Sequence, residues 1–252
     1  MELELFDANV WFGRPPQAPL CTPPATAAAL TAELAGHGVR RAIAWHTRQK
    51  DDSPVTGNAL LTDEIAGHDS LLGCWALLPP LTAELDVADL FNAMKIARVA
   101  AFRLFPDKHR YLLRRVVFGA LLDAIAERRV PVMLSLAYGC TWDGIYDLLT
   151  DYPNLTCILC DVGAWSADRY TYPLLDAYPR VFIETSMLAL EDGGVEAAAA
   201  RFGPERLLFG SGYPARYPEA AALQLAHAEI DSAGRALVAH GNLERILAEV
   251  IR

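Results

Sequence analysis

Residues 202–214 read FGPERLLFGSGYP, and this stretch decides the fold. The apolar run after Arg206 predicts a short β-strand over Leu207–Ser211, because a brief apolar run bounded by Gly and Pro is typical of a buried strand. Gly212 follows that strand directly. Glycine has no side chain, so position 212 can neither bind a cation nor transfer a proton.

The same unit of a β-rich run and an Ala/Leu/Glu-rich helical stretch repeats along the chain. Strands are expected at Leu3–Asn9, Arg41–His46, Leu71–Leu78, Val99–Leu104, Pro131–Leu136, Thr156–Asp161, Val181–Thr185 and Leu207–Ser211. Helices are expected at Pro24–Ala35, Asn58–Gly67, Ala83–Ala93, Leu113–Arg128, Trp142–Thr150, Arg169–Ala177, Val195–Phe202 and Pro218–Ile230. This order predicts a single (β/α)8 barrel over residues 1–252, with an extra C-terminal helix over Leu243–Ile251 that Asn242 would cap.

Composition narrows the class of protein. A length of 252 residues with 53% hydrophobic content suits one domain with a sizeable core. The net charge of −9, with no basic stripe, argues against a nucleic-acid partner. No apolar run reaches the roughly 18 residues of a membrane span, and the acidic start MELELFD does not look like a signal peptide. No Gly-rich phosphate loop of either standard type is present, and no cofactor is expected. Self-association into a homo-oligomer is left open.

The five cysteines are scattered, which predicts a reduced, cytoplasmic protein. Cys157 and Cys160 form a CxxC sequence, but it lies within an expected strand. Residues three apart on a strand face opposite sides of the sheet. We therefore expect neither a metal clip nor a redox dithiol at this pair.

Barrel geometry predicts which side chains reach a functional site, because such sites lie at the carboxyl ends of the strands. In the strand Arg41–His46, the small residues Ala42 and Ala44 share a face with His46. Small residues suit the crowded lumen and bulky ones such as Trp45 suit the layer between strands and helices. His46 is therefore expected to point into the barrel at its mouth.

Other polar side chains are expected at the same mouth. Alternation places Asp161 on the face of Leu159 and Glu184 on the face of Phe182. The polar residues at or near strand ends are Asn9, Arg103, Ser135, Asp161 and Glu184. The loop sequences HTRQKDD at 46–52 and DKHRY at 107–111 are expected to be solvated and to lie over the mouth.

Six further segments, in the right order, resemble the amidohydrolase-2 family, whose members are metal-dependent hydrolases and decarboxylases built on a TIM barrel. They are FDANVWFG at 6–13, GNALLTDEIAGHDSLLGCWALLPP at 57–80, RVAAFRLFP at 98–106, PVMLS at 131–135, YPNLTCILCDVGAW at 152–165 and YPRVFIETS at 178–186. The stretch at 202–214 resembles the family's eighth strand, FGPERILFGSDYP. The resemblance implies the barrel fold and a metal site at its mouth.

Carried over position by position, the resemblance implies that the family's metal ligands are replaced in this chain. The two histidines of the family's first strand correspond to Asn9 and Trp11, and the fifth-strand histidine corresponds to Ser135. The sixth-strand histidine corresponds to Asp161, and the eighth-strand aspartate to Gly212. Imidazoles that would hold Zn²⁺ at about 2.0–2.1 Å are missing, so no bound metal is expected. An oxygen-rich substitute site remains an alternative, built from Asn9, His46, Asp161 and Glu184.

Four residues are candidates for catalysis: Asp161, His46, Arg103 and Glu184. Asp161 or His46 would act as general base, and Arg103 would hold a carboxylate through its planar guanidinium. A structural ion pair between Asp161 and Arg103 is the competing interpretation. A second group would line a pocket for a flat ligand and comprises Asn9, Trp11, Trp75, Ser135, Tyr138, Trp165 and Tyr213.

Three classes of function follow from these residues. The first is a metal-independent hydrolase of a small cyclic ester, lactone or amide that carries a carboxylate. The second is a catalytically degenerate barrel that binds a small molecule or a protein partner at its mouth. The third is a hydrolase or decarboxylase with an atypical metal site. The sequence does not separate the first two, because function depends on the site and not on the fold.

Overall fold

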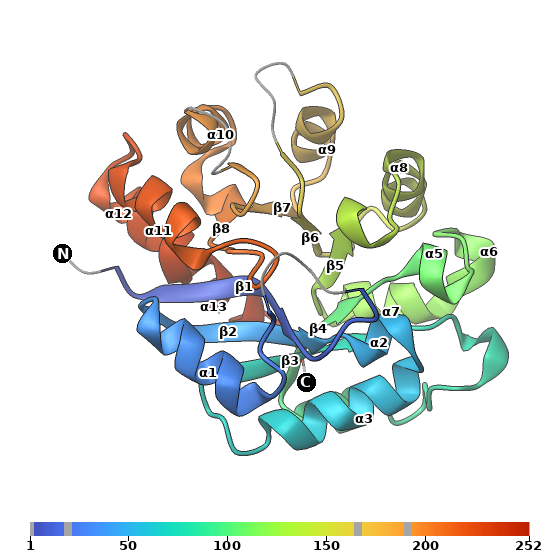
Figure 1. Cartoon of the computed structure of the whole chain (residues 1–252). Coiled ribbons are helices and arrows are strands. Elements are labelled where there is room, and N and C mark those ends of the chain that lie inside the picture. Colours follow the sequence, from blue (N-terminus) through green and yellow to red (C-terminus); the bar gives the residue numbers. More distant parts are fainter. Residues whose placement is uncertain (1–2, 18–21, 164–167, 189–192, 252) are drawn as a thin grey trace.

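The computed structural model describes residues 3–17, 22–163, 168–188 and 193–251. Within them, eight parallel strands follow one another around a single sheet in chain order (Figure 1). The strands are β1 (Leu5–Phe12), β2 (Val39–His46), β3 (Leu71–Ala76), β4 (Val99–Arg103), β5 (Val132–Ser135), β6 (Cys157–Cys160), β7 (Val181–Glu184) and β8 (Leu207–Leu208). The predicted (β/α)8 barrel is confirmed.

Backbone hydrogen bonds bring the two ends of the sheet together. Ala8 N–H donates to the Phe209 carbonyl at 2.8 Å, and Trp11 N–H donates to the Tyr213 carbonyl at 3.0 Å. β8 is only two residues long, so the segment that follows it makes these bonds beside β1. The barrel is therefore nearly closed, and residues after β8 belong to its mouth.

Helices surround the strands, with α1 and α3 beside β2 and β3 (Figure 1). They are α1 (Ala27–Gly36), α2 (Arg48–Asp51), α3 (Pro54–Ile65), α4 (Leu90–Ile96), α5 (Pro106–His109), α6 (Arg115–Phe118), α7 (Ala120–Glu127), α8 (Trp142–Asp151), α9 (Thr171–Ala177), α10 (Gly194–Phe202), α11 (Pro218–His227), α12 (Ser232–Ala236) and α13 (Asn242–Ala248). None of the helices in the described part of the chain is long and apolar enough to cross a bilayer.

Three local predictions are wrong. The stretches at 46–52 and 107–111 contain the short helices α2 and α5 instead of open loops, and Gln49 of α2 is fully buried. Gln49 accepts from His46 N–H at 2.7 Å and donates to the Cys74 carbonyl at 2.9 Å, which ties α2 to the barrel. Asn242 is not a cap but the first residue of α13, where its side chain donates to the Leu207 carbonyl at 2.9 Å.

The core has two layers, and they correct the predicted facing of β2. One cluster joins strand residues to helix residues, and Ala42 and Ala44 pack there against Leu30 and Leu61. The other fills the lumen with these side chains: Phe6, Ala8, Trp11, Ile43, Trp45, Cys74, Ala76, Ala101, Phe105, Met133, Ile158, Cys160, Phe182 and Leu208. Alanines from neighbouring strands leave space in the lumen for large residues such as Trp45. On the other face of β2, the small side chains of Ala42 and Ala44 let the helices approach the strand.

The paired cysteines behave as predicted. Cys157 packs in the outer cluster and Cys160 in the lumen cluster, so the two side chains lie on opposite faces of β6. The cysteines of the described residues, Cys74, Cys140, Cys157 and Cys160, are all buried free thiols.

Candidate functional site

A buried polar network lies at the carboxyl-terminal side of the lumen and is centred on Arg103. The guanidinium is fully buried, and its Nη1 donates to Asn9 Oδ1 at 2.9 Å. Its Nη2 lies 3.5 Å from Asp161 Oδ2, so the two residues form an ion pair. The rings of Trp45 and Tyr138 lie 5.1 and 5.2 Å from the guanidinium carbon, which adds cation–π contacts.

Asp161 follows β6 and has both carboxylate oxygens engaged. Oδ2 accepts from Ser135 Oγ at 2.5 Å and from Arg103 Nη2 at 3.5 Å. Oδ1 accepts from Arg216 Nη1 at 2.8 Å and lies 3.5 Å from Asn9 Nδ2. The expectation that Asp161 shares the face of Leu159 is wrong, since Leu159 packs in the outer cluster. The positive φ of Asp161, 58°, interrupts the alternation at the strand end and lets its side chain face the lumen.

Glu184 is the second carboxylate of the network and ends β7. Its Oε1 accepts from Asp161 N–H at 2.6 Å, from Ser186 Oγ at 2.8 Å and from Asn9 Nδ2 at 3.3 Å. Its Oε2 accepts from Ser186 N–H at 2.7 Å. Burial raises the pKa of Glu184, and the nearby charge of Asp161 raises it further. Phe182 faces the lumen with Glu184, as alternation predicted.

Arg216 and Ser186 belong to this network and were not predicted. Arg216 lies in the loop after β8, and its Nη1 contacts Asp161 Oδ1 and also Ser186 Oγ, the latter at 3.4 Å. No strand alternation applies to a loop residue, so the sequence carried no signal for Arg216. A Cβ at Gly212 would come within 2.5 Å of the same Nη1. The absence of a side chain at 212 therefore leaves room for the present position of Arg216.

A separate pocket of about 380 Å³ opens at the mouth beside this network. We call it the mouth pocket, and its lining residues are Trp11, Pro15, Pro16, Gln17, Trp45, Thr47, Lys50, Asp51, Lys108, Tyr138 and Ala215. The ring centroids of Trp45 and Tyr138 are 5.0 Å apart, and those of Trp45 and Trp11 are 5.8 Å apart. Because Trp45 and Tyr138 also contact Arg103, one layer of rings separates the mouth pocket from the polar network.

Unpartnered polar atoms and two lysines occur among the lining residues of the mouth pocket. Among the described residues, three buried polar atoms of the lining residues have no hydrogen-bond partner: Trp45 Nε1, Thr47 Oγ1 and the carboxylate oxygen Asp51 Oδ2. Lys50 forms an ion pair with Asp51 inside the pocket, and its ammonium lies 5.9 Å from the Tyr138 ring. Lys108 of α5 adds a second ammonium at the rim. Buried polar atoms are normally hydrogen-bonded, so these donors indicate a place for an acceptor.

Comparison with known proteins places this chain in a family. A family model described as Amidohydrolase matches residues 5–248. The chain belongs to this amidohydrolase family. No significant relative was found among curated proteins.

Solved structures share the amidohydrolase barrel at low sequence identity. An uncharacterised TIM-barrel protein from Bordetella bronchiseptica has a TM-score of 0.73 at 19% identity, over 98% of this chain and 99% of that one. A 2,6-dihydroxybenzoate decarboxylase from Rhizobium has a TM-score of 0.72 at 14% identity, over 98% and 99% of the two chains. A probable 2-pyrone-4,6-dicarboxylic acid hydrolase from Acinetobacter baumannii, with citric acid bound, has a TM-score of 0.72 at 13% identity, over 98% and 100%. These likenesses show the fold alone.

The family resemblance implies a metal ion at this mouth, where the oxygen atoms of Asp161 and Asn9 already contact guanidinium groups. Among the described residues, no group of three or more His, Cys, Asp or Glu side chains is arranged to hold a metal ion. Guanidinium nitrogens already lie beside both carboxylate oxygens of Asp161, and Asn9 Oδ1 accepts from Arg103. A divalent cation at this point would have to displace or repel two guanidinium groups.

The candidate residues His46, Trp75 and Tyr213 lie outside the network. The imidazole of His46 packs edge-on against Phe12 of the outer cluster, with ring centroids 4.9 Å apart, and its Nδ1 accepts from Arg48 N–H at 3.1 Å. His46 therefore does not point into the lumen, and burial lowers its pKa. Trp75 donates to Thr62 Oγ1 at 3.1 Å on the outer face of β3. Tyr213 packs in the outer cluster, and Trp165 lies outside the described residues.

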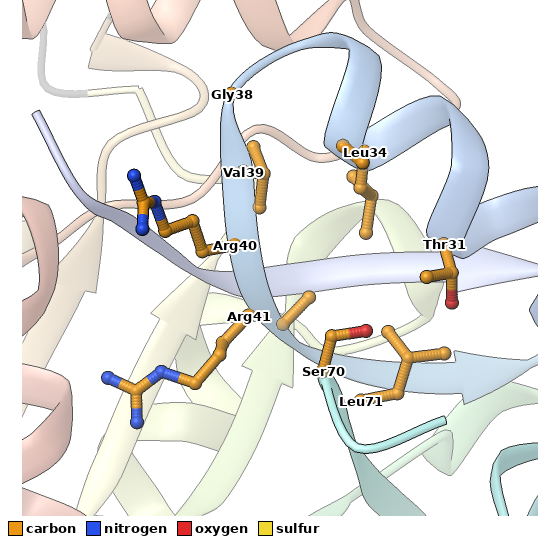
Figure 2. Close-up of a pocket in the computed structure, with 10 residues that line it drawn as sticks. Thr31, Leu34, Gly38, Val39, Arg40, Arg41, Ser70 and Leu71 are labelled. Atoms are coloured by element: carbon orange, nitrogen blue, oxygen red, sulfur yellow. The ribbon is translucent and has the colours of Figure 1, made fainter. Parts of the chain in front are cut away.

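A pocket at the opposite end of the barrel is not a second site of this kind. It measures about 360 Å³ and lies between the end of α1 and the starts of β2 and β3. Figure 2 shows Arg40 and Arg41 leaving β2 on the side away from Thr31 and Leu34. Arg41 pairs with Glu244 and stacks on Phe6, 4.4 Å from the ring centroid, so its charge is already neutralised.

Asp7 joins β1 to the segment after β8 and is fully buried. Its Oδ1 accepts from Asn9 N–H at 2.9 Å and from Ser211 N–H at 3.1 Å. Burial raises the pKa of Asp7 to about 7, although these hydrogen bonds oppose the shift. The residue thus fixes the position of the strand exit that carries Gly212.

The raised pKa of Asp7 predicts that the free energy of unfolding depends on pH, and that Asp7→Asn removes this dependence. An unfolded Asp has a pKa of about 3.9, so between that value and about 7 the folded protein holds a proton that the unfolded chain releases. The stabilisation is complete below pH about 4 and is lost as the pH rises through about 7. Relative to the parent, Asp7→Asn should gain on the order of 4 kcal/mol in free energy of unfolding between pH 4 and 8.

Urea unfolding at a series of pH values measures this difference. Asp176→Asn, a change in an exposed pair with Arg201, is the matched control and should change the free energy of unfolding by no more than about 1 kcal/mol. A flat difference for Asp7→Asn would show that Asp7 does not hold the extra proton.

Proposed function

We propose that this amidohydrolase-family barrel binds a flat, carboxylate-bearing small molecule in the mouth pocket, without a metal ion and without turnover. The observation that carries the proposal is a pair of buried, unpartnered donors, Trp45 Nε1 and Thr47 Oγ1, that belong to two lining residues of a pocket also lined by Lys50 and Lys108. Such donors are costly unless an acceptor meets them.

The shape of the mouth pocket supports a flat ligand. Its walls are the rings of Trp11, Trp45 and Tyr138, and its volume of about 380 Å³ lies within the usual range for small-molecule sites, roughly 300–1,000 Å³. Aromatic walls bind a planar ring by stacking and edge-on contacts. Two of the solved structures with this fold are, by their names, a dihydroxybenzoate decarboxylase and a probable pyrone dicarboxylic acid hydrolase. Those names fit the same class of ligand.

The state of the polar network supports binding over turnover. A general base needs a free lone pair within hydrogen-bond reach of the proton that it removes. Both oxygens of Asp161 are engaged by Ser135, Arg103 and Arg216, and His46 lies in another layer. The network is therefore fully hydrogen-bonded at Asp161, which suits it to support the pocket and not to remove a proton.

Calorimetric titration with isophthalate and with the neutral isophthalamide tests the proposal. The two probes have the same flat shape, and only isophthalate carries carboxylates. We expect isophthalate to bind at least about tenfold more tightly, since a charge-assisted hydrogen bond contributes about 1.5–3 kcal/mol. Lys108→Gln should weaken isophthalate binding about tenfold, whereas the control Lys95→Gln, on the distant helix α4, should not change it. Equal binding of both probes, or of neither, would refute the proposal.

A second candidate is metal-independent hydrolysis of a carboxylated lactone. The contact that favours it is the 2.5 Å hydrogen bond from Ser135 Oγ to Asp161 Oδ2, which puts a hydroxyl proton next to a carboxylate. Incubation of the protein with a pyrone or coumarin carboxylate, followed by NMR for ring-opened product, separates turnover from binding. A ring-opened product that disappears in Asp161→Asn would favour this candidate.

A further inference from the structure

We propose that Arg216 is an internal cation that occupies the position of a mouth metal ion, and that Gly212 is glycine to make room for it. This inference rests on the proposed absence of a metal ion from the mouth. It goes beyond that proposal because it assigns the absence to one loop residue, Arg216. Arg216 Nη1 contacts Asp161 Oδ1 at 2.8 Å and Ser186 Oγ at 3.4 Å.

The steric part of the argument concerns position 212. Gly212 has a φ of +67°, and a Cβ built on it would lie 2.5 Å from Arg216 Nη1 and 3.3 Å from the Ser186 side chain. A side chain at 212 would therefore require the Arg216 guanidinium, the end of a flexible side chain, to move from its present position. An acidic side chain at 212 would reach the space that the guanidinium now fills.

The electrostatic part concerns charge balance. The network contains two guanidiniums, Arg103 and Arg216, and two carboxylates, Asp161 and Glu184. Loss of the Arg216 charge would leave the carboxylates in excess, and a third carboxylate at 212 would increase that excess. Carboxylate and amide oxygens are the ligands that Mn²⁺ prefers. The same residues would then attract the divalent cation that Arg216 now excludes.

Arg103 does not serve as well in this role. It is fully buried, held by Asn9 and Asp161 and enclosed by the rings of Trp45 and Tyr138. Arg216 is reached from solvent, with 25% of its side chain exposed, so an ion that replaced it could enter from the mouth. Arg216 is therefore the residue that determines whether a guanidinium or a metal ion lies beside Asp161.

Mn²⁺ titration of matched variants, by calorimetry and by the shift in melting temperature, tests the inference. Gly212→Asp/Arg216→Gln should bind one Mn²⁺ at least about tenfold more tightly than the parent protein, and saturating Mn²⁺ should raise its melting temperature. Gly212→Asp/Arg216→Lys keeps a cation at 216 and should behave like the parent. If a double variant does not fold, the single variants Arg216→Gln and Arg216→Lys are compared, and the glutamine variant should bind Mn²⁺ more tightly.

The possible results separate this inference from the proposed function. Equal Mn²⁺ affinity in the glutamine and lysine variants, with a metal-free parent, would overturn the role of Arg216 alone. A parent protein that is purified with one bound metal would overturn the metal-free proposal as well. Tight Mn²⁺ binding confined to the glutamine variants supports both.

Discussion

Asp161→Asn should lower the free energy of unfolding by about 3–5 kcal/mol, the usual cost when one partner of a buried ion pair is removed. The substitution leaves Arg103 fully buried without its carboxylate and keeps only one of the two oxygens that accept from Arg216 and Ser135. Asn tolerates the left-handed backbone conformation of position 161, where φ is 58°, so the loss reports the charge and not backbone strain. Urea or thermal unfolding measures the change.

The matched control is Asp123→Asn. Asp123 accepts two hydrogen bonds from Arg115, at 2.8 and 2.9 Å, but both side chains are about half exposed. An exposed pair contributes about 0–1 kcal/mol, so this variant should melt close to the parent. An Asp161→Asn protein as stable as the Asp123→Asn control would contradict the paired arrangement and favour Asp161 as a free base.

Arg103→Met should be destabilising by a similar amount, about 3–5 kcal/mol. Methionine fills much of the volume but supplies no donor to Asn9 Oδ1 or to Asp161 Oδ2, and it removes the cation–π contacts with Trp45 and Tyr138. Two buried acceptors then lose a partner, which is costlier than the loss of the hydrogen bonds themselves. Unfolding experiments should show this loss without a change in the denaturant m-value.

The double variant Arg103→Met/Asp161→Asn completes a thermodynamic cycle. Removal of both charges costs less than the sum of the two single losses, because neither partner is left as an isolated buried charge. A coupling energy of about 1–3 kcal/mol is expected from residues in one network. Strict additivity would show that Arg103 and Asp161 do not act as a pair.

Much of the fold could be predicted from the sequence because the pattern of the βα units is local. Strand bounds such as Val99–Arg103 and Val181–Glu184 differ from the expected ones by one residue at the carboxyl end. The facing of side chains was less predictable. Periodicity showed that Ala42 and Ala44 share a face, but the choice between lumen and helix layer depends on which neighbouring strands supply the small residues.

The sequence could indicate the polar residues at strand ends, but not those in the segments that follow the strands. Arg103, Ser135 and Glu184 end their strands, and their positions at strand ends predicted that they lie at one mouth. Arg216 and the mouth pocket depend on the path of the chain after β8 and on the short helices α2 and α5. Asp161 joined the network against alternation, through a positive φ that no sequence pattern indicated.

The metal content of the purified protein tests the central claim most directly. Protein prepared without chelators is analysed for Zn, Mn, Fe and Ni, and its melting temperature is compared with and without EDTA. If the guanidiniums of Arg103 and Arg216 supply the cationic charge at the mouth, each metal should be present far below one equivalent and EDTA should not shift the melting temperature. One equivalent of a bound metal, with a lower melting temperature in EDTA, would contradict the account.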